Sequence, residues 1–377
     1  MKIAYILPSF SGDFEMPNGG VESAAINLMW GILVADNDVK MFLLYPNTNQ
    51  IIINVPERIT AVPINSTFKS VWTYNYPLIG ICKHIERSIV TINPDVVHVQ
   101  SAPGFYRKFN SNITFLTVHG IPYIDSSFHK RMASNVKSFL TKKIFLNDIK
   151  KYRNIIFLVN YGYALLKNDV KQNCNIYFVP NPIIYRRNNI LTAKNEIPIF
   201  FFSGILRPLK NIEVIIYACN YLKIQGVKFS LKFAGKFSST AYEQKIKGLI
   251  NGFNLNAQVV FLGQLTAKDI AIELSKIDVN LLPSFQEVCP MSIIEAMAKG
   301  KPSIASSVGG IPEMIFNTYN GYLIPINNAI ELANKIKSII VPITYESMKE
   351  NCLKMAEVYD YVNIANRTLQ CYKKISK

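Results

Sequence analysis

The sequence predicts two α/β domains of similar size, each a doubly wound parallel sheet, facing one another across a cleft. The length of 377 residues exceeds what a single compact core usually contains. Short runs of β-branched and aromatic residues alternate with longer amphipathic stretches, a pattern typical of a parallel sheet covered on both faces. A polar, asparagine-rich segment at 186–198, closed by a proline, separates two such series and is expected to be a linker.

The first series predicts an N-terminal domain over residues 1–185. Its clearest helix is expected at 20–35, directly after the first strand. Buried strands are expected at 2–8, 39–46, 95–100, 113–120, 154–160 and 175–182.

The second series predicts a C-terminal domain over residues 199–355. Strands are expected at 199–205, 229–235, 257–263, 279–284 and 301–307, the last of the series. Helices are expected at 211–226, 241–253, 266–277 and 290–299. The remaining residues, 356–377, are expected to form a helix that returns to the N-terminal domain.

Composition is typical of a cytoplasmic globular protein. Six cysteines show no CxxC pair, and four histidines lack metal-ligand spacing, so neither a disulfide framework nor a zinc site is expected. Pro8 interrupts the N-terminal apolar run before it could serve as a signal peptide. No apolar run approaches the roughly 20 residues that a membrane-spanning helix needs.

A net charge of +16 calls for an anionic partner: nucleic acid, a membrane surface or a phosphorylated substrate. No basic low-complexity tail is present, which disfavours nucleic acid. Lysines interleave with apolar residues at 128–153, which predicts a basic amphipathic helix. Either this helix contacts an anionic membrane surface, peripherally at the inner face of the cell membrane, or it is an ordinary surface helix packed on its own domain.

The stretch 284–315, "SFQEVCPMSIIEAMAKGKPSIASSVGGIPEMI", contains the most distinctive pattern. Pro290 suits the first turn of a helix, and Gly300 suits its C-terminal cap. The backbone N–H groups of Met291 and Ser292 are then unpaired donors at a helix N-terminus, suited to an anion or to sugar hydroxyls.

Two glutamates flank this helix start. Glu287 lies in the loop that follows a predicted strand, and Glu295 lies more than one turn inside the helix. A carboxylate can accept hydrogen bonds from both hydroxyls of a vicinal diol. The pair could therefore hold two sugar rings, whereas the alternative for Glu295 is a solvated helix face.

The run "PSFQEVCPMSIIEAMAKGKPSIASSVGGIPEMI" resembles the E-x7-E signature of family 4 retaining glycosyltransferases, which have the GT-B fold of two facing Rossmann-like domains. Both glutamates, the Gly309–Gly310 pair and Glu313 stand where that pattern expects them. The resemblance extends along most of the chain through segments at 17–29, 94–100, 115–121, 179–182, 201–211 and 259–263.

In the C-terminal half the resemblance implies donor binding by the turn at 201–211. Lys210 and Arg207 would contact the donor phosphates, with Gly204 and Asn211 in the same turn. The family's arginine position holds Ile205, so Arg207, two residues further along, is the candidate replacement. Surface charges without a ligand are the alternative for both cations.

In the N-terminal half the resemblance implies a glycine-rich loop and a histidine at the site. Gly19 and Gly20 would allow close approach of donor phosphate and acceptor, although a simple turn explains them equally well. Glu22 would lie on the acceptor side or orient the helix. His98, within a strand, is interpreted as structural, and His119, at a strand end, as lining the sugar pocket.

The resemblance implies transfer of a sugar from a nucleotide-sugar donor, UDP- or GDP-linked, to a saccharide or lipid-linked acceptor, with retention and without a metal or other cofactor. Glu287 would hold the sugar hydroxyls and Glu295 the ribose, while Lys210, Arg207 and the helix start would stabilise charge on the leaving phosphate. Bacterial surface polysaccharide assembly, such as O-antigen or capsule, would suit this chemistry. A sugar-nucleotide epimerase, a catalytically inactive relative and a non-enzymatic basic protein binding membrane or nucleic acid are the alternatives.

Overall fold

The computed structural model describes residues 1–17, 19–47, 55–65, 79–101, 104, 110–127, 132–185 and 194–375. It divides the chain into two compact units. The first consists of Met1–Pro182 and Tyr361–Lys377, and the second of Ile183–Asp360. Each unit contains one parallel sheet, which confirms the predicted fold class of two doubly wound α/β domains.

In the first unit the described strands form a sheet in the order β3-β2-β1-β4-β5-β6-β7, with every pairing parallel. The strands are β1 (Lys2–Ile6), β2 (Lys40–Asn47), β3 (Ile59–Asn65), β4 (Val96–Gln100), β5 (Thr114–Val118), β6 (Asn154–Phe157) and β7 (Asn175–Phe178). Strands β4, β5 and β6 are buried at every position, as strands covered on both faces must be. The strand order reverses between β1 and β4, where such folds form a crevice at the carboxyl ends of the strands.

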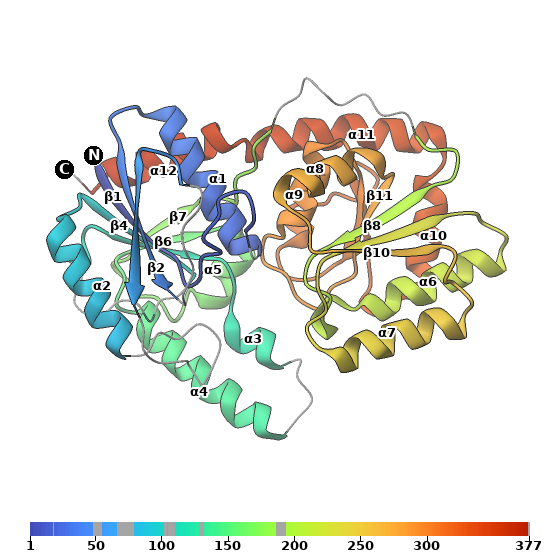
Figure 1. The fold of residues 1–377 in the computed structure, drawn as a ribbon, viewed down its shortest axis with the longest axis horizontal. Coiled ribbons are helices and arrows are strands. Elements are labelled where there is room, and N and C mark those ends of the chain that lie inside the picture. The colour runs from blue at the N-terminus through green and yellow to red at the C-terminus, as the bar shows by residue number, and fades with distance from the viewer. Residues whose placement is uncertain are drawn as a thin grey trace. The chain divides into compact units, whose positions relative to one another are not determined.

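Helices cover both faces of this sheet (Figure 1). Side chains alternate along β1: Ile3 and Tyr5 pack with α1 (Gly20–Ala35) and α12 (Tyr361–Lys373). Ala4 and Ile6 belong to the opposite layer, which contains α2 (Ile79–Ile92), α4 (Met132–Ile149) and α5 (Asn160–Leu166). The short helix α3 (Pro122–Ser127) lies beside α4.

In the second unit the described strands form a parallel sheet in the order β10-β9-β8-β11-β12-β13. The strands are β8 (Ile199–Ser203), β9 (Ser230–Ala234), β10 (Val259–Gly263), β11 (Val279–Leu282), β12 (Ser303–Ser306) and β13 (Gly321–Ile324). Here the order reverses between β8 and β11, so the segments after these two strands leave the sheet edge side by side.

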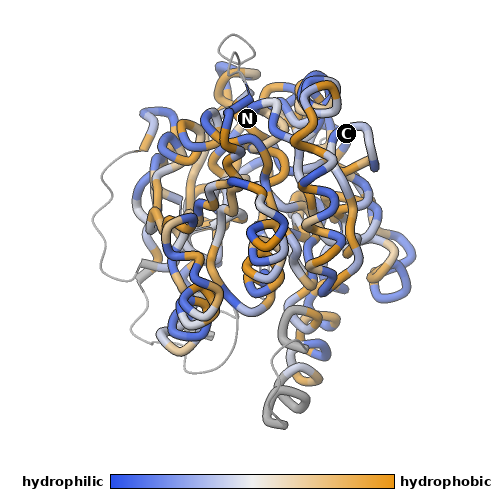
Figure 2. The backbone as a smooth tube through the Cα atoms, turned by 90° about the vertical axis from the view of Figure 1, so that its right-hand side faces the viewer, coloured by the Kyte–Doolittle hydropathy of each residue, from blue (hydrophilic) through white to orange (hydrophobic). Residues whose placement is uncertain are grey.

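The second sheet is also covered on both faces (Figure 1). The helices α8 (Ala267–Lys276) and α9 (Met291–Ala298) lie on one face, with α11 (Pro342–Ala356) against α9. The helices α6 (Ile212–Ile224), α7 (Thr240–Gly252) and α10 (Ala329–Ile339) lie on the other. In Figure 2, the helical coils drawn in colour alternate between hydrophilic and hydrophobic residues, as expected of helices with one packed side.

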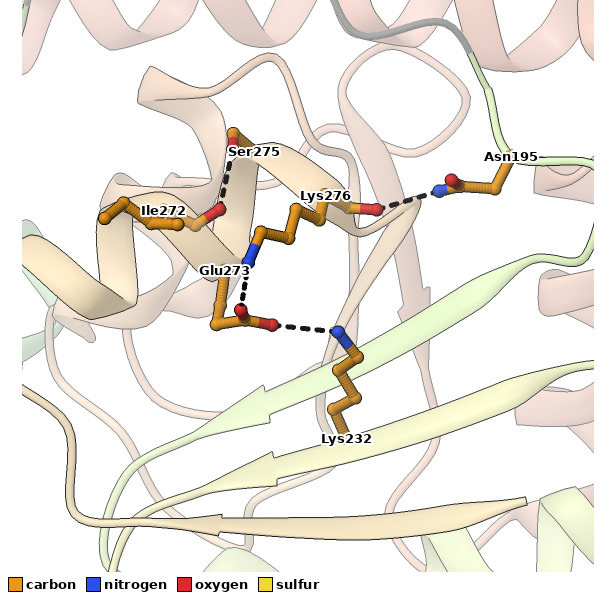
Figure 3. A network of polar contacts seen from close by, with 6 residues as sticks. All are labelled: Asn195, Lys232, Ile272, Glu273, Ser275 and Lys276. Atoms are coloured by element: carbon orange, nitrogen blue, oxygen red, sulfur yellow. Dashed lines mark hydrogen bonds and ion pairs between the residues drawn. The ribbon is translucent and has the colours of Figure 1, made fainter. Parts of the chain in front are cut away.

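A charged network fixes α8 over this sheet (Figure 3). Glu273 of α8 accepts hydrogen bonds from Lys276 at 2.6 Å and from Lys232 of β9 at 2.9 Å. Burial acts to raise the pKa of Glu273, but the two lysines outweigh it and hold this pKa below its usual value. Asn195 donates to the backbone oxygen of Lys276 at 2.8 Å, which ties the entry of β8 to the same helix.

Several predicted boundaries differ from the structure. The units divide at Pro182, slightly before the predicted domain end at 185, and the part of the 186–198 linker that is described, 194–198, belongs to the second unit. The C-terminal helix expected over 356–377 begins at Tyr361 as α12 and belongs to the first unit, because a 3-10 turn at Glu357–Tyr359 and the extended ψ of Asp360 separate it from α11. The strand at 301–307 is followed by one more strand, β13, which was not predicted.

The first and the last residues of the second unit pair with each other. Ile183 N–H donates to the backbone oxygen of Tyr359 at 2.8 Å, and Ile183 forms a parallel bridge with Asp360. Within the first unit, Asn27 of α1 donates to the backbone oxygen of Pro182 at 3.0 Å. Among the helices of the described residues, none is long and apolar enough to cross a membrane.

Candidate functional site

In the second unit, the predicted donor-binding turn follows β8. Gly204 is exposed with a φ of 141°, a conformation that favours glycine. The chain then forms a short 3-10 helix at Pro208–Lys210, and Asn211 takes the left-handed conformation that starts α6. The side chain of Asn211 is buried and donates to Asn327 at 3.0 Å, so in this structure it braces the turn.

The loop after β11 meets that turn directly. The ammonium group of Lys210 contacts the carboxylate of Glu287, although the two residues lie 77 positions apart. Ser284, which is fully buried, donates to the same carboxylate at 2.8 Å. The backbone N–H of Phe285 donates to the carbonyl of Leu209 at 2.9 Å. The structure therefore brings Lys210 and Glu287 together at the point where the strand order reverses.

A third segment, after β12, supports this cluster from the backbone. Gly310 N–H donates to the carbonyl oxygen of Glu287 at 3.1 Å. Gly309 has a φ of 56°, and a Cβ placed on it would lie only 1.8 Å from the same oxygen. Only glycine permits this close approach, so the Gly309–Gly310 pair holds the loop that carries Glu287 in position.

The helix start after this loop is close to the prediction. Pro290 is the N-cap residue of α9, one position before the first helical turn in which it was expected, and Gly300 ends the helix with a φ of 64°. The N–H groups of Met291 and Ser292 have no hydrogen-bond acceptor among the described residues. Two backbone donors at a helix N-terminus therefore remain available to an anion.

Glu295 lies on α9 one turn beyond these donors, on the same side as Ser292. It is half-buried, and burial raises the pKa of its carboxyl group to about 7. No described residue forms a hydrogen bond or an ion pair with it. A solvated helix face does not explain such a carboxyl group, because water would keep the pKa near 4.5.

The candidate phosphate contact Arg207 is half-buried, and its Nε atom is buried without a hydrogen-bond partner. Leu206 lies between it and Ile205, is fully buried, and forms a parallel bridge with Phe237. Side chains alternate along such an extended segment, so Ile205 and Arg207 project to the side opposite Leu206. The two positions thus share one side of the turn.

In the first unit, the glycine-rich loop precedes α1. Gly19 is the N-cap residue and Gly20 the first residue of the helix, and both are exposed. A Cβ on Gly19 would meet no atom within 4 Å among the described residues, so protein packing does not require glycine there. Glu22 is buried and accepts hydrogen bonds from Ser11 N–H at 2.7 Å and Ser11 Oγ at 2.6 Å, so it ties the preceding loop to the helix.

His119 follows β5 and is half-buried, with its Nε2 atom 2.6 Å from Oε1 of Gln100. His98 is fully buried and hydrogen-bonded on both ring nitrogens, to Tyr372 and to Thr117, which confirms its structural interpretation. Burial lowers the pKa of His98 to about 3 and that of His119 to about 4, so both rings are neutral at pH 7.

A small cavity of about 20 Å³ lies at the carboxyl edge of this sheet, with space for about one water molecule. Four polar residues of its lining come from β4, β5 and the residue after β5: His98, Gln100, Thr117 and His119. The rest comes from α1, α12, β6 with the residue after it, and the segment after β7, which add the polar side chains of Asn181 and Thr368. Gln100 was not singled out from the sequence, and its position at a strand end was the only signal that could have found it.

The basic stretch at 128–153 includes α4, although 128–131 lie outside the described residues. Phe145 and Ile149 are buried in the core of the first unit. Phe139, Leu140 and Ile144 are exposed, by 67%, 49% and 45%. The helix therefore has apolar side chains on both sides, and packing on its own domain uses only one of them.

In the described part of the chain, no three His, Cys, Asp or Glu side chains lie together as the ligands of a metal ion would.

Comparison with known proteins identifies the family. The family model described as "Glycosyl transferases group 1" matches residues 186–355. The N,N'-diacetylbacillosaminyl-diphospho-undecaprenol alpha-1,3-N-acetylgalactosaminyltransferase of Campylobacter jejuni is 34% identical over 279 residues, which cover 70% of this chain and 71% of that protein. The chain belongs to the group 1 glycosyltransferases.

Other relatives of this group 1 chain align over shorter segments or share only the fold. The putative colanic acid biosynthesis glycosyltransferase WcaL of Escherichia coli K12 is 33% identical over 133 residues, 34% of this chain and 32% of that protein. The chain spans about a third to a half of the length of the first curated relatives that it matches. The structure of Anabaena HepE with UDP-glucose has a TM-score of 0.75 at 17% identity, covering 100% of this chain and 99% of HepE, and shows a shared GT-B fold.

Proposed function

We propose that this group 1 chain is a retaining glycosyltransferase that moves a sugar from a nucleotide-sugar donor to a saccharide or lipid-linked acceptor in surface polysaccharide assembly. The observation that carries the proposal is the cluster of Lys210, Glu287 and Ser284 where the strand order of the second unit reverses. A helix start with two available N–H donors follows this loop, and the half-buried carboxyl group of Glu295 lies one turn later.

The donor we propose is a UDP- or GDP-sugar. Lys210, Arg207 and the N–H groups of Met291 and Ser292 supply positive charge and hydrogen-bond donors for a diphosphate. Glu295 supplies an unpaired acceptor suited to the ribose diol. Among relatives, HepE was solved with UDP-glucose, and the Campylobacter protein is named as an N-acetylgalactosaminyltransferase, which favours a uridine nucleotide.

In the reaction, the bond between the anomeric carbon and the phosphate oxygen breaks, and the electron pair leaves with the nucleoside diphosphate. Lys210 and the start of α9 stabilise the charge that develops on that phosphate. The acceptor oxygen bonds to the anomeric carbon on the same face, and its proton passes to the departing phosphate. Glu287 contacts Lys210 in the structure, and we propose that it orients the ammonium group and holds hydroxyls of the donor sugar.

Arg207 is proposed to supply the charge that Ile205 lacks. Both residues project from the same side of an extended segment, and Nε of Arg207 is buried without a partner. A buried guanidinium N–H that no protein atom satisfies is costly, and a phosphate oxygen would satisfy it.

The acceptor we propose is linked to a lipid. The Campylobacter relative is named for a diphospho-undecaprenol acceptor, and the Escherichia coli relative for colanic acid biosynthesis. On α4, Phe139, Leu140 and Ile144 are exposed beside lysines, the combination by which a helix lies in an anionic membrane interface. This exposure supports peripheral binding to the inner face of the cell membrane.

A thermal-shift screen with UDP-, GDP- and ADP-sugars tests the donor. We expect one nucleotide class to stabilise the protein, because a ligand at a hundred times its Kd adds about 2.7 kcal/mol. Glu295→Ala should reduce this stabilisation, Glu287→Ala should slow turnover more than it weakens binding, and Glu350→Ala, at an exposed position on α11, serves as the control. The proposal fails if no nucleotide sugar stabilises the protein, or if Glu295→Ala binds like the wild type.

Sedimentation with vesicles tests the membrane surface. Binding to phosphatidylglycerol vesicles, with little binding to phosphatidylcholine alone, is the expected result. Each exposed lysine near the surface should contribute about 1 kcal/mol, so Lys143→Gln with Lys150→Gln should weaken binding at least tenfold. Lys151→Gln is the matched control, because Lys151 already pairs with Asp148. Equal binding of the double variant and the wild type would contradict the proposal.

A further inference from the structure

A chain of buried polar side chains connects His119 to the C-terminal helix. His119 Nε2 lies 2.6 Å from Oε1 of Gln100, and the amide nitrogen of Gln100 lies 3.3 Å from Nε2 of His98. His98 Nδ1 lies 2.5 Å from the hydroxyl group of Tyr372 on α12, which is 3.0 Å from the hydroxyl group of Tyr5. These contacts join β1, β4, β5 and α12 inside the first unit.

The donors and acceptors of this chain determine where the proton of His119 lies. The oxygen of an amide can only accept a hydrogen bond, so Nε2 of His119 must carry the hydrogen. A neutral imidazole then has its lone pair on Nδ1. Among the described residues, Nδ1 of His119 has no hydrogen-bond partner, so this acceptor remains available.

The amide of Gln100 also contacts His98. Its nitrogen faces the ring of His98, and that ring is fully buried and held at 2.6 Å by Thr117 Oγ1 on the neighbouring strand β5. The amide nitrogen lies 3.3 Å from Nε2 and 3.4 Å from Nδ1 of that ring, and the hydroxyl groups of Thr117 and Tyr372 can each donate or accept. The tautomer of His119 therefore follows from the orientation of the Gln100 amide, because reversing the amide would place its nitrogen against His119 Nε2.

We propose that Gln100 is a positioning residue that holds His119 as the Nε2–H tautomer and so presents its Nδ1 atom as a hydrogen-bond acceptor. The partner assigned to this acceptor is a hydroxyl group of the donor sugar, and this assignment rests on the proposed function. An amide suits the task better than a carboxylate, because it fixes the tautomer without attracting a second proton to the ring. Burial, which lowers the pKa of His119, acts in the same direction.

The tautomer can be measured on the free protein by NMR with ¹⁵N-labelled histidine, using His119→Asn to assign the signal. We expect His119 at pH 7 to show a protonated Nε2 with slow hydrogen exchange and an unprotonated Nδ1. Gln100→Leu, of similar size, should speed the exchange of that hydrogen at least tenfold, because the acceptor is lost. Gln100→Glu should give a ring protonated on both nitrogens, because its carboxylate favours the charged form.

Two results would overturn the positioning role: an Nδ1–H tautomer in the wild type, or unchanged hydrogen exchange in Gln100→Leu. Kinetics then test the acceptor role. We expect kcat of Gln100→Leu to fall about tenfold with little change in KM for the donor, as the loss of one oriented hydrogen bond predicts. If the wild type is active and kcat of Gln100→Leu is unchanged, the contact with the sugar hydroxyl is refuted. If the wild type is inactive with every donor, the proposed function is refuted, and the NMR result alone decides on the tautomer.

Discussion

Replacing Glu295 with glutamine should make the protein more stable at alkaline pH and weaker in donor binding. The carboxyl group is half-buried, has no partner among the described residues, and has its pKa raised by burial to about 7 from its usual 4.5. Between these two values the folded protein retains a proton that the unfolded chain releases. The free energy of unfolding therefore falls as pH rises through this window, and the full cost is present above pH 7.

The size of this cost follows from the two pKa values. At 1.36 kcal/mol per pKa unit, the difference corresponds to about 3 kcal/mol, an upper bound because Glu295 keeps some contact with water. Glutamine has the shape of the protonated acid and cannot ionise. The stability of Glu295→Gln should thus match the wild type near pH 4 and exceed it increasingly between pH 4.5 and 7.

Calorimetric unfolding of both proteins from pH 4 to pH 9 measures the effect. About 2–4 °C in Tm per kcal/mol is expected for a unit of this size, so the variant should unfold several degrees higher at pH 8. Glu350→Gln, at an exposed position on α11, is the control and should change nothing at any pH. A Tm difference that is independent of pH, or a destabilised variant at pH 8, would refute the reasoning.

Three further variants test other parts of the structure. Lys210→Met should lower kcat about 10²- to 10³-fold. It should also destabilise the free protein more than the double variant Lys210→Met with Glu287→Gln does, because the single change leaves the Glu287 carboxylate, only 11% exposed, without its partner. Equal unfolding curves of the two variants would contradict this. Gly309→Ala should lower Tm and turnover through a backbone clash, while the control Gly248→Ala, on an exposed helix position with open space, should be neutral or stabilising. Tyr372→Phe should cost about 1–3 kcal/mol in chemical unfolding by leaving two buried polar atoms unpaired, and a loss below about 0.5 kcal/mol would argue against the buried network.

Most strands of both sheets could be predicted because burial on both faces leaves continuous apolar runs in the sequence, whereas β3, at the edge of the first sheet, was not predicted. The helix at 20–35 was predicted with the bounds that α1 has, since it follows a buried strand and a glycine pair. The strand β13 lacks this contrast, because it begins with a glycine and is followed directly by Pro325, which are residues typical of a turn. The break at Asp360 was missed because it depends on the pairing of Ile183 with Asp360, which are far apart in the sequence.

The candidate site was only partly predictable. The resemblance named Glu287, Lys210 and Glu295, but their physical states depend on contacts between distant segments. The ion pair of Lys210 with Glu287 and the raised pKa of Glu295 both arise from packing, which no local pattern encodes. Likewise, α4 has apolar residues on two sides, so its periodicity could not separate the packed side from the exposed one.

The two units provide different kinds of polar group, and the difference suits the proposed reaction. In the first unit, His98 and His119 are neutral, because burial lowers the pKa of each ring far below 7. In the second unit, Lys210 contacts Glu287, which lies in the loop just before α9 and its backbone donors. When a sugar leaves a nucleoside diphosphate, negative charge grows on the phosphate, whereas the sugar hydroxyls need hydrogen bonds without net charge. For the proposed reaction, we expect the cations of the second unit to stabilise the phosphate charge as the bond breaks, and the buried histidines of the first unit to stay neutral throughout.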